Sequence, residues 1–137
     1  MPHSEINELN QVNQFIDEGK VKEAFKFISE LEQRDDFSFK EKISCKLVKA
    51  NLIAQLGNYL DAIKGAEAIF QESQKVGDLL SSFDALVIQA YSYVMMVNVI
   101  KGGELVKQAQ DLLKIIKETF SIDLRERIFL SKDERNY

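Results

Sequence analysis

The chain has 137 residues, of which 45% are hydrophobic and 29% charged, and a formal net charge of −4. This balance is typical of one folded domain and excludes a wholly disordered chain. The negative charge argues against nucleic acid, because phosphate binding requires a concentrated basic surface. A single cysteine excludes an internal disulfide. No stretch resembles a secretion signal or a membrane span, so we expect a cytoplasmic protein with no membrane contact.

Two helices are expected in the first part of the chain, before Phe37. Ser4 can cap the first helix, whose apolar residues recur at spacings of three and four, the helical period. Gly19 is expected to end it, because glycine readily adopts the left-handed conformation at a helix C-terminus. The second helix begins near Lys20 and fades at Arg34.

The next two helices have clearer boundaries. Ser38 and Glu41 form an S-x-x-E capping box, which predicts the start of a third helix that ends at Gly57. Asn58 is expected to cap a fourth helix that ends near Gly77.

A fifth helix is predicted from about Leu79 to Lys101, where Gly102 and Gly103 break it, and a sixth from Glu104. The segment 121–137 contains further apolar residues. We expect it to cap the last helix pair, because a terminal repeat otherwise exposes a core face. The alternatives are an interaction segment or the start of another repeat.

The three helix pairs read as copies of one pattern. The first repeat step, from Gly19 to Gly57, is 38, and the second repeat step, from Ala50 to Ala90, is 40. A nearly fixed period in this range is typical of helical repeat arrays. The third copy is less regular, because Gly102 follows Ala90 by twelve positions, and this predicts an altered turn. The predicted repeats within the single domain 1–137 are about 5–36, 39–77 and 79–120.

The second copy resembles a tetratricopeptide repeat. Gly57 follows the first helix, Tyr59 comes two positions later and Ala62 three after that, while Ala50 matches the small residue inside the first helix. The period exceeds the family's usual length of about 34 residues, and the proline between repeats is missing. The resemblance implies an all-α fold, a right-handed α-solenoid of about three antiparallel helix pairs with a C-terminal capping helix or tail.

The resemblance also implies a binding groove. In such arrays the first helix of each pair lines a concave surface, here through Leu9, Asn13, Asp17, Leu47, Asn51, Gln55, Val87, Tyr91, Met95 and Asn98. Asn13 and Asn51 fall at equivalent places, and amides can hydrogen-bond an extended peptide backbone. The alternative is that both are ordinary solvated residues. The family's clamp for chaperone C-terminal tails needs a lysine where Leu9 stands, so we expect no such ligand.

The fifth helix is apolar on every side between residues 85 and 100. Such a helix needs cover all round. It is either enclosed in the core, or Tyr91 and Met95 face the groove or a second subunit, where tyrosine and methionine suit adaptable contacts.

Catalytic and metal-binding patterns are not evident. His3 is the sole histidine, which leaves no histidine-based triad or metal cluster. Cys45 has no nearby histidine or cysteine and reads as a buried, inert thiol. The Gly102–Gly103 pair lacks the lysine of a phosphate loop. We therefore expect no enzyme, no cofactor and no metal.

The sequence thus predicts a non-catalytic protein–protein interaction module that holds a protein or peptide in the concave groove. One alternative is a homodimeric scaffold that self-associates through the fifth helix or the tail. Another is a peptide-responsive or small-molecule-responsive regulatory domain of a larger signalling system.

Overall fold

The computed structural model describes residues 8–119, and this range is entirely helical, which confirms the predicted all-α class. Its six helices are α1 (Glu8–Asp17), α2 (Val21–Glu32), α3 (Phe39–Gln55), α4 (Tyr59–Lys75), α5 (Leu79–Met95) and α6 (Val99–Thr119). The predicted cap Ser4 and the segment 121–137 lie outside the described residues.

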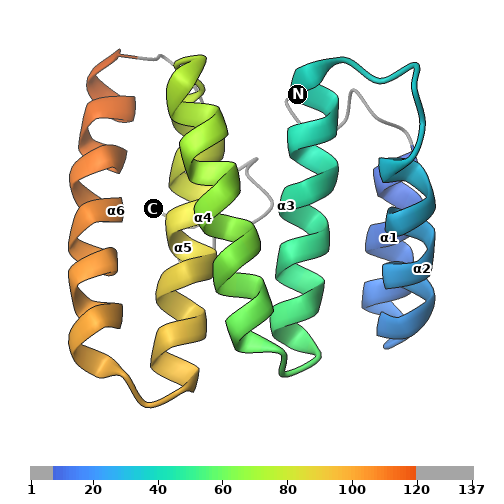
Figure 1. Ribbon diagram of the computed structural model, residues 1–137, viewed down its shortest axis with the longest axis horizontal. Helices are drawn as coiled ribbons and strands as arrows, with labels where there is room; N and C mark the ends of the chain where they lie inside the picture. Colours follow the sequence, from blue (N-terminus) through green and yellow to red (C-terminus); the bar gives the residue numbers. More distant parts are fainter. Residues whose placement is uncertain (1–7, 120–137) are drawn as a thin grey trace.

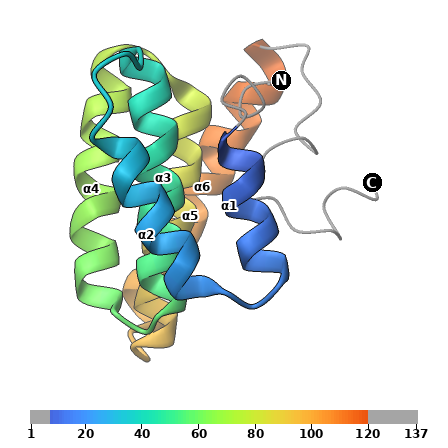
Figure 2. The ribbon, with the colours of Figure 1, turned by 90° about the vertical axis from the view of Figure 1, so that its right-hand side faces the viewer.

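Each helix packs on the next one in the chain, and α5 also packs on α3. Figure 1 shows that successive helices run in opposite directions, so that the α1–α2, α3–α4 and α5–α6 turns face the lower end of the molecule. The view in Figure 2 places α1 and α2 in front of the other four helices.

The start of α3 is fixed by a capping box, as predicted. The hydroxyl of Ser38 accepts a hydrogen bond from the amide of Glu41 at 3.1 Å, and the Glu41 carboxylate accepts one from the amide of Ser38 at 2.8 Å. These bonds satisfy two amide donors that a helix start leaves free. The prediction for Asn58 is wrong in its detail, because Asn58 precedes α4 without a side-chain capping bond.

Four of the five turns share one geometry. Each contains a residue with positive φ, namely Gly19 (76°), Gly57 (86°), Gly77 (72°) and Val97 (63°). The amide of the following residue then donates to the carbonyl five positions earlier, at 2.7 to 3.1 Å. This is the hydrogen bond that closes a Schellman motif. The glycines therefore end their helices in the way the sequence predicted.

The predicted boundary between the fifth and sixth helices is wrong. Helix α5 ends at Met95, and Gly102 and Gly103 lie inside α6. The turn is made by Val97, which stands one second repeat step after Gly57 and adopts the same left-handed conformation. The third copy therefore keeps the turn and replaces its glycine with valine.

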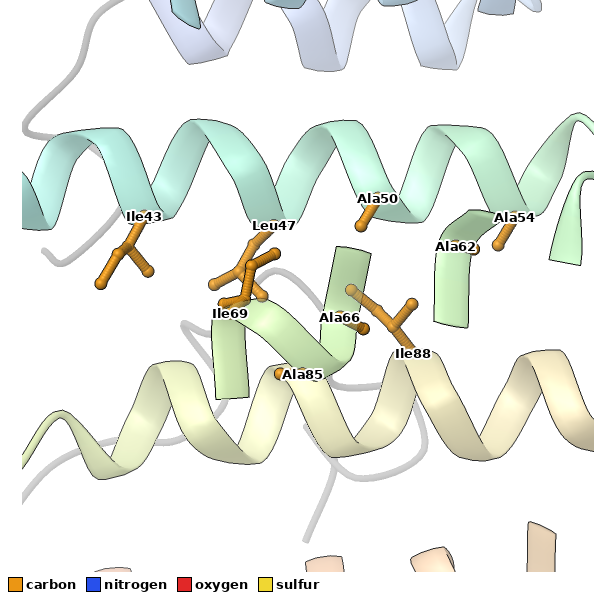
Figure 3. Close-up of a cluster of buried hydrophobic side chains, with 9 residues drawn as sticks. All are labelled: Ile43, Leu47, Ala50, Ala54, Ala62, Ala66, Ile69, Ala85 and Ile88. Carbon is orange, nitrogen blue, oxygen red and sulfur yellow. The ribbon is translucent and has the colours of Figure 1, made fainter. Parts of the chain in front are cut away.

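Buried side chains form three successive clusters along the molecule. The first joins α1 and α2 to α3, the second joins α3 and α4 to α5, and the third lies between α5 and α6. Figure 3 shows the second cluster, in which Ala85 and Ile88 of α5 point toward the residues of α3 and α4.

The link between α2 and α3 is held by charge. Arg34 pairs with the carboxylates of Glu8 and Asp36, and its guanidinium lies 4.5 Å from the centre of the Phe37 ring. The pKa of Asp36 is lowered by its hydrogen bond with Arg34. The pKa of Glu8 is lowered by its backbone hydrogen bond and then by its bond with Arg34.

Candidate functional site

Two of the predicted groove residues belong to the core. Leu9 is 2% exposed and packs in the first cluster, and Leu47 is fully buried in the second. Their assignment to a partner-binding surface is therefore wrong. The reason is that α3 covers the face of α1 that carries Leu9, and α5 covers the face of α3 that carries Leu47.

The other predicted residues divide by position. Those within the helices, Asn13, Asn51 and Val87, are half-buried, whereas five are exposed: Asp17, Gln55, Tyr91, Met95 and Asn98. Apart from Tyr91, these five lie at the C-terminal ends of α1, α3 and α5 or just beyond α5. The accessible part of the predicted site is therefore displaced toward the end of the molecule that carries the α1–α2, α3–α4 and α5–α6 turns.

Helix α5 changes character along its length. Residues 81–90 are buried apart from Val87, which is half-buried, so this part is core as one of the two interpretations required. From Tyr91 onward most side chains are exposed. The helix therefore combines both interpretations, with core in its first part and an accessible apolar surface in its last part.

An apolar tip forms where α5 turns into α6. We define it as Met95, Met96, Val97, Val99 and Ile100, whose exposure ranges from 40% at Met96 to 82% at Val97. No charged residue occurs between positions 85 and 100. Contiguous exposed apolar side chains of this kind mark contact surfaces in soluble proteins. The second repeat step could have located the turn, and with it the tip, by aligning Val97 with Gly57.

A second apolar feature lies beside the tip and is here called the α5–α6 groove. It is a cavity of about 360 Å³ lined by Phe83, Val87, Ala90, Tyr91, Val94, Val106, Ala109, Gln110 and Leu113. At its edge Tyr91 meets Tyr59 of α4 edge to face, with ring centres 6.3 Å apart. Gln110 is the one lining residue with a purely polar side chain, so the groove suits an aliphatic ligand surface.

Cys45 is buried in the first cluster, as its apolar surroundings predicted. Burial raises the pKa of its thiol to about 11, so the thiolate that reacts with electrophiles is scarce at neutral pH. Within residues 8–119 no three histidine, cysteine or acidic side chains gather as metal ligands. His3 lies outside this range.

None of the helices described between residues 8 and 119 is both long and apolar enough to cross a membrane. Among these residues the exposed apolar side chains are concentrated around the end of α5 and the start of α6, which makes this region the candidate functional site.

Comparisons with protein-family models, with curated proteins and with solved structures found no match to this chain. The tip and the groove therefore have to be interpreted from their own chemistry.

Proposed function

We propose that this chain is a non-catalytic protein–protein interaction module, and that its apolar tip binds an apolar segment of a partner protein. The observation that carries the proposal is the exposure of five neighbouring apolar side chains without a charge among them. Burying each such side chain on binding contributes roughly 1 kcal/mol or more.

The proposal includes the finer description of the fold. The chain is a right-handed α-solenoid of three antiparallel helix pairs that resembles tetratricopeptide repeats, and it works in the cytoplasm. The two repeat steps that join Gly19, Gly57 and Val97 support the repeat, since all three residues take the same conformation. Asp17, Gln55 and Tyr91 border the end of the array at which this partner binds.

A partner segment fits the tip better than a second copy does. Five partly exposed side chains provide a few hundred Å² of apolar surface, whereas a stable protein interface buries about 800 Å² on each side. A symmetric dimer formed by the tip alone falls short of this area. A short segment that docks weakly does not.

Photo-crosslinking tests the proposal in the full chain. A crosslinking amino acid replaces Ile100 in the tip, and in a control chain it replaces Val76, which is equally apolar and 58% exposed at the opposite end of the molecule. The partner segment captured only at position 100 is then synthesised and titrated against purified protein. We expect Ile100→Glu to weaken its binding at least tenfold, and Val76→Glu to leave it unchanged.

The proposal fails if the synthesised segment binds Ile100→Glu as tightly as the unmodified chain. Light scattering of the unmodified chain provides a separate outcome. If the mass is that of a dimer and falls to a monomer in Ile100→Glu, the homodimeric scaffold replaces the partner-binding module. Helical circular dichroism should be the same in both variants, because both positions are exposed.

A further inference from the structure

The described residues contain two helix-binding sites that are already filled, here called seats. In the first seat, α1 and α2 present Leu9, Val12, Ala24, Ile28 and Leu31, and α3 packs into it with Cys45 and Val48. All seven side chains are buried. The seat thus joins the first helix pair to the helix that follows it.

The second seat repeats the first residue by residue. One first repeat step leads from the five members of the first seat to Leu47, Ala50, Ala62, Ala66 and Ile69, which receive Ala85 and Ile88 of α5. Ala85 and Ile88 in turn stand one second repeat step after Cys45 and Val48. Figure 3 shows Ile88 among these side chains. A small residue and an aliphatic residue one turn later therefore enter each filled seat.

The α5–α6 groove is a third copy of this seat. Val87, Ala90, Val106 and Ala109 line it, and each stands one second repeat step after a member of the second seat. The fifth counterpart, at the same step from Ala62, is the buried Gly102. A cavity of about 360 Å³ remains where the next helix would pack.

We propose that the third seat binds the chain's own segment 120–137 as a helix. This inference concerns the groove and does not rest on the partner proposed for the tip. The segment follows α6 directly, as α3 follows α2 and α5 follows α4. It is long enough to form a helix like α5, which fills the second seat with 17 residues.

The chemistry of the segment fits the seat. Leu124 and Ile128 are one helical turn apart, and Ile128 stands one second repeat step after Ile88. The same step from Ala85 reaches Arg125, whose charge does not suit an apolar seat, so Leu124 and Ile128 enter together. Because the segment is tethered beside the groove, its effective concentration is in the millimolar range. A weak helix–groove contact is then sufficient for binding.

Hydrogen exchange of the full chain tests this inference. We expect the amides of residues 120–137 to exchange at least tenfold more slowly than in the free peptide of the same sequence, at every protein concentration. Val106→Glu, at a half-exposed position in the groove, should abolish this protection. Ile115→Glu is the matched control, since Ile115 is a half-exposed aliphatic residue on the same helix outside the groove lining.

Ile128→Asp tests the segment from its own side and should also abolish the protection, while the amides of α1 to α4 exchange as in the unmodified chain. Three results would overturn the inference. The first is exchange of residues 120–137 at the rate of the free peptide. The second is protection that Val106→Glu and Ile128→Asp leave intact. The third is protection that disappears on dilution, which would assign the groove to a second copy of the chain.

Discussion

Gly102 of α6 lies so close to Val94 of α5 that a Cβ atom at Gly102 would stand 2.6 Å from Cγ2 of Val94. Real Cβ atoms essentially never approach another atom so closely. Gly102 occupies the place of Ala24 and Ala62 in the two preceding pairs, so the third pair requires the smallest residue where the others accept alanine. The bulk of Val94, which stands where α3 has Ala54, accounts for the difference.

Gly102→Ala should therefore lower the free energy of unfolding. Crowding of this kind costs about 1–3 kcal/mol, of which the better helix propensity of alanine offsets about 1 kcal/mol. Gly103→Ala is the control, because nothing lies within 4 Å of its added Cβ, and it should stabilise the protein by about 0.5–1 kcal/mol. Urea denaturation measures both. If Val94 is the obstacle, the double variant Val94→Ala/Gly102→Ala recovers the loss.

Val97 adopts φ of 63° at a position that three other turns give to glycine. The left-handed conformation costs a residue with a side chain about 1–2 kcal/mol, and glycine avoids this penalty while losing more chain entropy on folding. We expect Val97→Gly to raise the free energy of unfolding by about 0.5–1 kcal/mol. Val99→Gly, two residues later inside α6, should lower it by a similar amount. Equal effects of the two substitutions would contradict the assigned turn.

Ser38 and Asn58 precede α3 and α4, but only Ser38 caps its helix through a side-chain bond. Ser38→Ala should lower the free energy of unfolding by about 1 kcal/mol, the usual effect of losing such a cap. Asn58→Ala should change it by less than about 0.5 kcal/mol. Thermal denaturation of the two variants compares them directly, and a larger effect at Asn58 would show that its amide caps α4 after all.

The ion pairs of Arg34 predict a dependence of stability on pH. The pKa values of Glu8 and Asp36 are lowered on folding from their ordinary values of 4.5 and 3.8. Their contribution is thus complete above about pH 5 and is lost as the pH falls through the lowered values. Arg34→Met should destabilise the protein at about pH 7 and have a smaller effect at about pH 2.5, as measured by urea denaturation. Lys22→Met, at an exposed position of α2, should show no such change with pH.

Much of the fold follows from local signals in the sequence. The capping box at Ser38 and the glycines at positions 19, 57 and 77 set helix boundaries within a few residues, because capping bonds and positive φ depend on neighbours along the chain. The first repeat step likewise indicated that the second helix pair repeats the first. These features required no knowledge of how the helices pack.

The tertiary structure decided what the sequence left open. Leu9 and Leu47 match a groove position by spacing, yet the next helix covers them, and Val97 takes over a turn that the glycines at 102 and 103 were expected to make. In α5, one continuous apolar run is divided into a buried part and an exposed tip. Helical periodicity shows which residues share a face, but burial depends on whether another helix packs on that face, and this is decided by contacts between residues distant in sequence.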